Sequence, residues 1–262
     1  MVHLVFCKHL RHKQSFDQPV TSEFYHQIDA RQVDQLRPIT FTLDYIRYAE
    51  GSVLVTWGET RVLCNLTIQE GVPGWLAGQG SGWLTAEYAL LPRSTLTRTP
   101  REINGLKGRT QEIRRLIGRA LRMAVDLTLI GERTLLLDCD VLQADGGTRV
   151  ASVTGGYVAL ALGLRKLIAS GDIPAKALHA PIAAVSAGIV RGQAVLDPDY
   201  AEDSQADVDL NIVQNASGQF IEIQGTAENQ PFSPDALENM LSLAEKGIRE
   251  IVSLQTAILK TD

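Results

Sequence analysis

A glycine pair between a strand-like run and a helical segment is the feature that most constrains this chain. Residues 134–142 are apolar, residues 150–168 have a helical pattern, and residues 145–149 between them read Asp-Gly-Gly-Thr-Arg. Glycines let the backbone turn sharply, and the first amides of the helix then have no intrahelical partner. These amides and the helix dipole form an anion site, to which Thr148 adds a hydroxyl and Arg149 a forked cation suited to phosphate. The alternative is a turn that only caps the helix, but the arginine favours phosphate.

The length and composition are those of a folded protein with a sizeable core. The 262 residues are 45% hydrophobic and 21% charged, enough for one large domain or two small ones. No apolar run approaches the roughly 20 residues that span a bilayer, and the apolar residues 1–6 are too short for a secretory signal. Cys7, Cys64 and Cys139 lack the paired spacing of metal or redox sites. Because free thiols fit a reducing compartment, we expect a cytoplasmic protein.

The charge of the chain is unevenly distributed. The net charge of −5 argues against non-specific coating of nucleic acid, but residues 93–122 hold nine Lys or Arg and two acids. That stretch carries +7 and the other 232 residues carry −12, so the protein can hold a polyanion at one place. Arg114, Arg115 and Arg122 are equally compatible with the solvated face of an amphipathic helix.

Three arginines of the same stretch do not fit a helix surface. Arg93, Arg98 and Arg101 lie in a Ser/Thr/Pro-containing loop, where no core requires them. Their position favours a binding role over a packing role.

Residues 1–28 stand apart from the rest of the chain. They show no clear periodicity and contain four of the five histidines, which are His3, His9, His12 and His26. The irregular spacing of these histidines disfavours a metal site. We therefore predict a partly disordered extension over residues 1–28 and a single domain over residues 29–262.

From residue 39 onward, strand and helix patterns alternate irregularly. After an initial β pattern we expect strands over residues 52–57, 61–68, 134–142, 182–190, 193–196, 208–213 and 220–224. Helices are predicted over residues 108–129, 150–168 and 234–259, the last with Ser233 as N-cap and Pro234 as its first residue. A hairpin joins the first two of these strands, and a glycine-rich loop follows over residues 71–82. This mixture favours an α+β class with layered architecture over an all-parallel sheet.

A second group of candidate functional residues is acidic. Asp207 and Asp209 alternate with apolar residues at the entry of a strand, so we expect both carboxylates on one face, with Asp203 in the preceding loop. Beside a phosphate site, converging carboxylates are typical of a magnesium or manganese site. An acidic, solvated loop is the alternative.

The scarcity of histidine argues against several catalytic mechanisms. Outside residues 1–28 the only histidine is His179, in a Lys/Ala/Pro-containing loop with nothing reactive nearby. A Ser-His-Asp or Cys-His mechanism therefore lacks an obvious base. Catalysis driven by a metal and by arginine suits phosphoryl transfer, in which positioning and charge stabilisation supply most of the acceleration.

Several stretches, in this order, closely resemble the bacterial ribonuclease PH family of phosphorolytic exoribonucleases, which trim tRNA 3′ ends. The stretches are residues 36–38, 49–52, 78–88, 91–95, 108–110, 137–149, 202–204 and 224–228. The resemblance covers about residues 29–259, and it implies that residues 29–262 form one catalytic domain. It also implies a two-layer mixed β-sheet and helix architecture of the ribonuclease PH type.

The resemblance assigns roles to particular residues. Arg109, in a Gly-Arg-Thr motif, would bind inorganic phosphate, the co-substrate, together with three residues of a Gly-Thr-Arg motif, which are Gly147, Thr148 and Arg149. Asp203 and Asp209 match an acidic pair implicated in binding Mg²⁺ (or Mn²⁺) and in catalysis. The implied reaction is reversible: phosphate attacks the last 3′,5′-phosphodiester of RNA, such as a tRNA precursor, and releases a nucleoside diphosphate.

The resemblance also implies how RNA is held. Arg93, Arg98 and Arg101 match basic loop positions that face the RNA, and the assembly would be a homohexameric ring built from dimers. Such a ring would concentrate the basic stretch around a central opening. The chain departs from the family pattern at Gly74 and Ala77, which occupy positions that are often basic.

Two other functions fit a protein with these features less well. A non-catalytic ring subunit of the same fold would only guide RNA, but such relatives typically lose the phosphate arginines or the acidic pair, both of which are present here. A small-molecule phosphotransferase would need a longer glycine loop to wrap a triphosphate. The length of the chain excludes polynucleotide phosphorylase, which has two such domains and appended RNA-binding modules.

Overall fold

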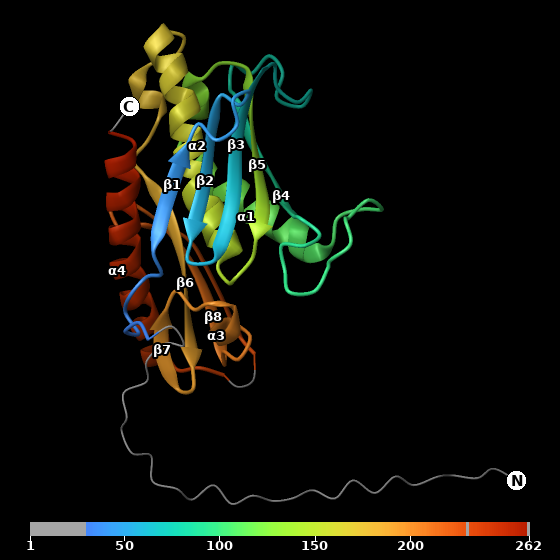
Figure 1. Ribbon diagram of the computed structural model, residues 1–262. Coiled ribbons are helices and arrows are strands. Elements are labelled where there is room, and N and C mark those ends of the chain that lie inside the picture. The colour runs from blue at the N-terminus through green and yellow to red at the C-terminus, as the bar shows by residue number, and fades with distance from the viewer. Residues whose placement is uncertain (1–29, 229–230, 261–262) are drawn as a thin grey trace, which may run out of the picture.

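The computed structural model describes residues 30–228 and 231–260, which form two β-sheets and the helices around them (Figure 1). The strands are β1 (Ile39–Leu43), β2 (Gly51–Trp57), β3 (Thr60–Glu70), β4 (Trp83–Leu90), β5 (Arg133–Gln143), β6 (Ile182–Val190), β7 (Gln193–Leu196), β8 (Val208–Asn215) and β9 (Phe220–Ala227). The α-helices are α1 (Gly108–Arg122), α2 (Thr148–Ser170), α3 (Tyr200–Asp203) and α4 (Pro234–Ile258). The predicted α+β class is confirmed. The predicted extension over residues 1–28 lies outside the described residues.

The first sheet has the strand order β1-β2-β3-β5-β4 and the second β7-β6-β8-β9. In β3 and β5 buried side chains alternate with half-exposed ones, as expected for strands with one face on the core. The hairpin between β2 and β3 is confirmed, with Gly58 and Glu59 as its turn.

None of the helices in the described part of the chain is long and apolar enough to cross a membrane.

Helix α2 is the central element of the core. Residues 150–164 are buried on every side of the helix, which packs against β2 and β3 of the first sheet and β6 of the second. Close approach depends on glycine, because a Cβ on Gly51 would lie 1.9 Å from the carbonyl oxygen of Ala159, and one on Gly155 would lie 2.3 Å from Val55. The start of α2, with the glycine turn before it, is therefore held in one place relative to both sheets.

The other long helix, α4, begins where the pattern predicts and ends at Ile258, one residue before the predicted end. Ser233 is its N-cap and accepts a hydrogen bond from the amide of Ala236, and Pro234 is its first residue. The helix packs on the second sheet, and Gln255 donates from Nε2 to the carbonyl oxygens of Thr154 in α2 and Ile182 in β6. In Figure 1 it runs along one side of the molecule, and its main strand contacts are with β6, β7 and β8 of the second sheet.

Three features of the fold differ from the prediction. The helix predicted over residues 108–129 ends at Arg122, because Val125 bridges Leu178 and the chain continues into a short 3₁₀ turn, Leu127–Leu129. Strand β4 was not predicted; it pairs in parallel with β5, a contact between segments far apart in the sequence. Asp203 does not lie in a loop but ends α3, which begins with a capping box between Asp199 and Glu202.

Candidate functional site

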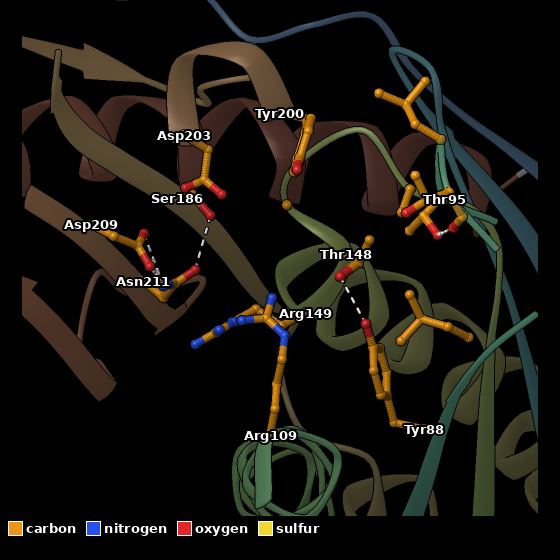
Figure 2. Close-up of a pocket in the computed structure, with 16 residues that line it drawn as sticks. Tyr88, Thr95, Arg109, Thr148, Arg149, Ser186, Tyr200, Asp203, Asp209 and Asn211 are labelled. Atoms are coloured by element: carbon orange, nitrogen blue, oxygen red, sulfur yellow. Dashed lines mark hydrogen bonds between the residues drawn. The ribbon is translucent and has the colours of Figure 1, made fainter. Parts of the chain in front are cut away.

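A cavity of about 270 Å³ brings together residues from both sheets and from three helices (Figure 2). Its lining includes Tyr88 of β4, Thr95 of the β4–α1 loop, Arg109 of α1, Gly147, Thr148 and Arg149 at the start of α2, Ser186 of β6, Tyr200 and Asp203 of α3, and Asp209 and Asn211 of β8. All six residues to which the resemblance assigns phosphate or acidic roles therefore line one cavity.

The glycine turn forms one wall of this cavity. Gly146 and Gly147 have φ values of +74° and +67°, in the left-handed region where glycine is favoured. Gly147 is the N-cap of α2, and it provides no side chain to cap the first amides of the helix. Thr148 shares a 2.8 Å hydrogen bond between its Oγ1 and the Oη of Tyr88, which fixes the rotamer of the threonine. The helix start thus presents polar donors to the cavity in a fixed geometry.

Two arginines project into the cavity from different helices (Figure 2). Arg109 belongs to the first turn of α1, and no carboxylate of the described residues lies within ion-pair distance of it. Arg149 is 14% exposed, and its Nη1 lies 3.4 Å from both Glu112 Oε1 and Gln224 Oε1. These long contacts leave much of the hydrogen-bonding capacity of Arg149 for a bound anion.

Asp203 and Asp209 face the arginines across the cavity. Burial raises the pKa of Asp203, as does the neighbouring Asp209, whereas Arg109 and Arg149 oppose this shift. Burial also raises the pKa of Asp209, against the effects of Arg149 and of Asn211. Asn211 donates from Nδ2 to both carboxylate oxygens of Asp209, at 3.2 and 3.1 Å.

Asp207, which was expected to share a face with Asp209, is not part of the cavity lining. It precedes the first residue of β8, so the alternation of a strand does not extend to it. The acidic pair is therefore Asp203 with Asp209.

The basic loop, residues 91–107 between β4 and α1, extends away from both sheets (Figure 1). Arg93, Arg98 and Arg101 are exposed, and none of them lines the main cavity, although Arg101 borders a neighbouring hollow that includes Tyr88 and Arg109. The loop adds Thr95, Leu96 and Thr97 to the cavity lining.

Two arginines of α1 have packing partners. Arg114 forms an ion pair with Glu87 of β4. Arg122 donates to the carbonyl oxygen of Leu84, and its guanidinium lies 4.0 Å from the ring centre of Trp83. These contacts hold α1 against β4. Neither polyanion binding nor simple solvation, the two alternatives for these side chains, therefore describes them fully.

Sequence reasoning missed several lining residues. Tyr88 was part of a family-like stretch but received no role, because β4 was not predicted. Ser186 and Asn211 are joined by a 2.9 Å hydrogen bond that donates from the serine hydroxyl, and this connects β6 to β8 behind Asp209. No local pattern marks such residues; only the pairing of the strands brings them to the cavity.

Comparisons with known proteins agree with this geometry. Models of the 3′ exoribonuclease family match residues 35–163 (domain 1) and 180–247 (domain 2). Ribonuclease PH of Crocosphaera subtropica is 54% identical over 231 residues, which cover 88% of this chain and 96% of the relative. Ribonuclease PH of Moorella thermoacetica is 54% identical over 233 residues, covering 88% of this chain and 93% of the relative.

Solved structures share the fold at lower identity. Rice (Oryza sativa) Rrp46 has a TM-score of 0.72 at 19% identity, covering 88% of this chain and 99% of that one. The Archaeoglobus fulgidus exosome with RNA bound to the active site has a TM-score of 0.72 at 22% identity, covering 86% and 91%. With identity above half along almost the whole length of its bacterial relatives, the chain belongs to the ribonuclease PH family, phosphorolytic exoribonucleases that shorten the 3′ ends of tRNA with inorganic phosphate as co-substrate.

Proposed function

We propose that the cavity between the two sheets is where inorganic phosphate attacks the last 3′,5′-phosphodiester of the RNA. The observation that carries this proposal is that Arg109, the glycine turn with Thr148 and Arg149, and the pair Asp203 and Asp209 all open onto one space. Both matched family regions contribute lining residues, so we take residues 29–262 as one catalytic unit.

Arg109 and Arg149 hold the attacking phosphate. Bringing one anion against another requires dense cationic screening, and the guanidinium groups supply charge and forked donors together. Thr148 and the amide of Gly147 fix the rotation of the phosphate, and Tyr88 keeps the Thr148 hydroxyl in place. In the reaction an oxygen of this phosphate bonds to the terminal phosphorus, and the bond from phosphorus to the 3′-oxygen breaks. The shortened RNA takes up a proton as its 3′-hydroxyl, and a nucleoside diphosphate leaves.

Asp203 and Asp209 are the residues that would hold a divalent cation. The described residues contain no cluster of three or more His, Cys, Asp or Glu side chains that would form a complete protein cage for a metal. Mg²⁺ is commonly held by one or two carboxylates together with water and substrate phosphates, so an acidic pair facing the phosphate site fits Mg²⁺, with Mn²⁺ as a substitute. When bound there, such an ion would supply charge stabilisation at the scissile phosphoryl group and the leaving 3′-oxygen.

Arg93, Arg98 and Arg101 hold the RNA that leads into the cavity. They are exposed on a loop that also contributes to the cavity wall, so a strand with its 3′ end in the cavity passes close to them. We further propose a homohexameric ring of dimers, which would gather these loops around an opening, and a cytoplasmic location, in keeping with the free thiols of Cys64 and Cys139.

A labelling experiment tests the site assignment. A tRNA precursor, Mg²⁺ and radiolabelled phosphate are supplied to the native protein, to Arg109→Gln, and to Arg249→Gln, a matched control at an exposed position of α4. Labelled nucleoside diphosphates are expected from the native protein and the control but not from Arg109→Gln. Near-native labelling by Arg109→Gln at low phosphate would show that the site is assigned wrongly. Release of monophosphates without added phosphate would indicate hydrolysis instead.

A further inference from the structure

A buried ion pair, Arg37 with Asp197, joins distant parts of the chain next to the glycine turn, and neither residue lines the cavity. Asp197, which follows β7, has a fully buried side chain, and the side chain of Arg37 is 4% exposed. Arg37 donates to Asp197 from its backbone amide at 2.8 Å, from Nε at 3.1 Å and from Nη2 at 2.6 Å. Trp57, at the end of β2, donates from Nε1 to the same carboxylate at 2.8 Å. The carboxylate thus fixes the plane of the Arg37 guanidinium.

The guanidinium in turn holds the backbone of the glycine turn. Arg37 donates from Nη1 to the carbonyl oxygen of Asp145, and its Nη2 lies 3.1 Å from the point that a Cβ on Gly147 would occupy. Thr60 adds a second fastening, since its Oγ1 accepts from the amide of Asp145 at 2.9 Å and donates to the carbonyl oxygen of Gly146 at 2.7 Å. The amide and carbonyl groups of Asp145 and the carbonyl group of Gly146 are therefore all bonded, and the conformation of the turn is fixed before any anion arrives.

Asp197 also begins the segment that carries the acidic side of the cavity. The chain runs from Asp197 through the capping box of α3 to Asp203. Gly146 packs directly on this segment, because a Cβ there would lie 2.8 Å from the carbonyl oxygen of Pro198 and from the carbonyl carbon of Asp199. One buried carboxylate therefore links the phosphate side, which belongs to β5 and α2, with the acidic side, which belongs to the second sheet.

Stability alone does not account for such a pair. Desolvation of two buried charges offsets most of their attraction, so replacing a buried pair with uncharged groups is often neutral for stability, whereas removing one partner is costly. What an uncharged replacement loses is directional bonding, here the bond from Arg37 to the turn. We propose that Arg37 and Asp197 are positioning residues, which touch no substrate but set the spacing between the phosphate-binding turn and the carboxylates. This inference rests on the proposed phosphate site and extends it.

The first test compares kinetic constants in Arg37→Met and in a matched control, Arg133→Met. Arg133 is the first residue of β5 and forms an ion pair with Glu70 at 3.0 Å, which the control variant breaks. This position is at the end of β5 opposite the glycine turn. Arg37→Met is expected to raise the KM for phosphate by at least about tenfold, because misplacement of an anion site by a fraction of an ångström weakens a positioned contact. The KM for the RNA is expected to stay within about twofold of native in both variants, since neither touches the RNA path. An equal rise of both KM values in Arg37→Met would contradict the proposal.

A double variant separates positioning from stability. Asp197 has a φ of +52°, which Asn tolerates well, so Asp197→Asn preserves the backbone and an acceptor for Trp57. In Arg37→Met the Asp197 carboxylate keeps only Arg31, whose Nη1 lies 3.8 Å away, and in Asp197→Asn the guanidinium of Arg37 loses its carboxylate partner, so each single variant lowers Tm. The double variant removes both charges of the Arg37–Asp197 pair and recovers part of that loss. The KM for phosphate is expected to remain raised in the double variant, because the carbonyl oxygen of Asp145 still lacks its donor.

Recovery of a native KM for phosphate along with Tm would mean that the pair only stabilises the fold. Failure of the positioning role can be distinguished from failure of the phosphate site itself, because the labelling experiment with Arg109→Gln tests the phosphate site separately. If Arg109→Gln loses phosphate-dependent turnover while Arg37→Met and the double variant keep a native KM for phosphate, the site stands and the positioning role is wrong.

Discussion

The glycine turn and the basic loop both contain arginines that we propose bind anions, but the two segments are built in opposite ways. In the turn, residues 145–149, backbone groups are bonded to Arg37 and Thr60, and the helix that follows is buried on every side over residues 150–164. In the basic loop, residues 91–107, the arginines are exposed, and contacts such as that of Arg93 with the carbonyl oxygen of Leu96 stay within the loop. A small anion that must react requires fixed donors, whereas a long polyanion requires only nearby charge. Changes at the cavity should therefore be severe, and changes in the loop graded and sensitive to salt.

The largest effect is expected at Asp209, on the acidic side of the cavity. Asp209→Asn should abolish turnover at every magnesium concentration, because it removes a cavity carboxylate while keeping the shape of the side chain. Burial raises the pKa of Asp209, so the fold disfavours the ionised form, and the charge lowers stability above the pKa of the folded state. We therefore expect Asp209→Asn, measured without metal, to have a higher Tm than native at neutral pH. This gain should fade as the pH falls through that pKa, because the native carboxyl is then protonated too. A lower Tm for Asp209→Asn at neutral pH would contradict this reading.

Arg149→Ala tests the phosphate side of the cavity. Loss of one positioned charged donor at a reacting group costs roughly 100- to 1,000-fold in turnover, and that loss should persist at low salt. Arg149 makes only two 3.4 Å contacts but favours the ionised forms of Asp203 and Asp209, so Tm at neutral pH should fall only slightly. Steady-state rates over a range of phosphate concentrations at saturating RNA check this. Near-normal turnover of Arg149→Ala at low phosphate would show that Arg149 does not hold the phosphate.

Gly146→Ala tests whether the shape of the turn matters apart from its side chains. Gly146 has a φ of +74°, and a Cβ there would meet the backbone of the segment before α3 at 2.8 Å. Gly192→Ala is a matched control, since Gly192 has a φ of +80° but nothing within 4 Å of an added Cβ. Both substitutions should cost about 1–2 kcal/mol of backbone strain in the free energy of unfolding, and Gly146→Ala more because of the contact. Only Gly146→Ala should raise the KM for phosphate, and an equal KM in the two variants would contradict the account.

The smallest effect is expected in the basic loop. Arg93→Ala or Arg98→Ala should weaken RNA binding severalfold and reduce the slope of log affinity against log salt by about one unit, since each removes one phosphate contact. The KM for phosphate should stay native. Binding of a tRNA precursor at several salt concentrations measures this. A loss of RNA affinity that does not depend on salt, or a raised KM for phosphate, would mean that the loop acts through fixed contacts, as the glycine turn does.

The same contrast explains how much was predictable from the sequence. Local signals predicted the β5–turn–α2 unit and the start of α4 at Ser233 and Pro234, and the structure confirms them. Strand β4 was missed because its Thr-Ala-Glu-Tyr-Ala run has a weak β pattern, and its parallel pairing with β5 joins distant segments. Helix α3 was missed because a single capped turn is too short to show periodicity.

For the site, the turn was evident from residues 145–149 alone, whereas nothing local distinguishes Arg109 from the other basic residues of its stretch. Its role came from the resemblance, and its place in the cavity from the fold. Arg37 and Asp197 received no role at all, because they are 160 positions apart in the sequence. Pairing between such distant residues exists only in three dimensions.

The central claim is that Arg109, Thr148 and Arg149 converge on one tetrahedral anion. The most direct measurement is a crystal structure of the protein soaked in phosphate or sulfate. The account predicts a single oxyanion in the cavity in contact with all three side chains and with the amides at the start of α2. An anion bound elsewhere, or Arg109 turned away from Thr148 with apolar groups filling the space between them, would contradict it.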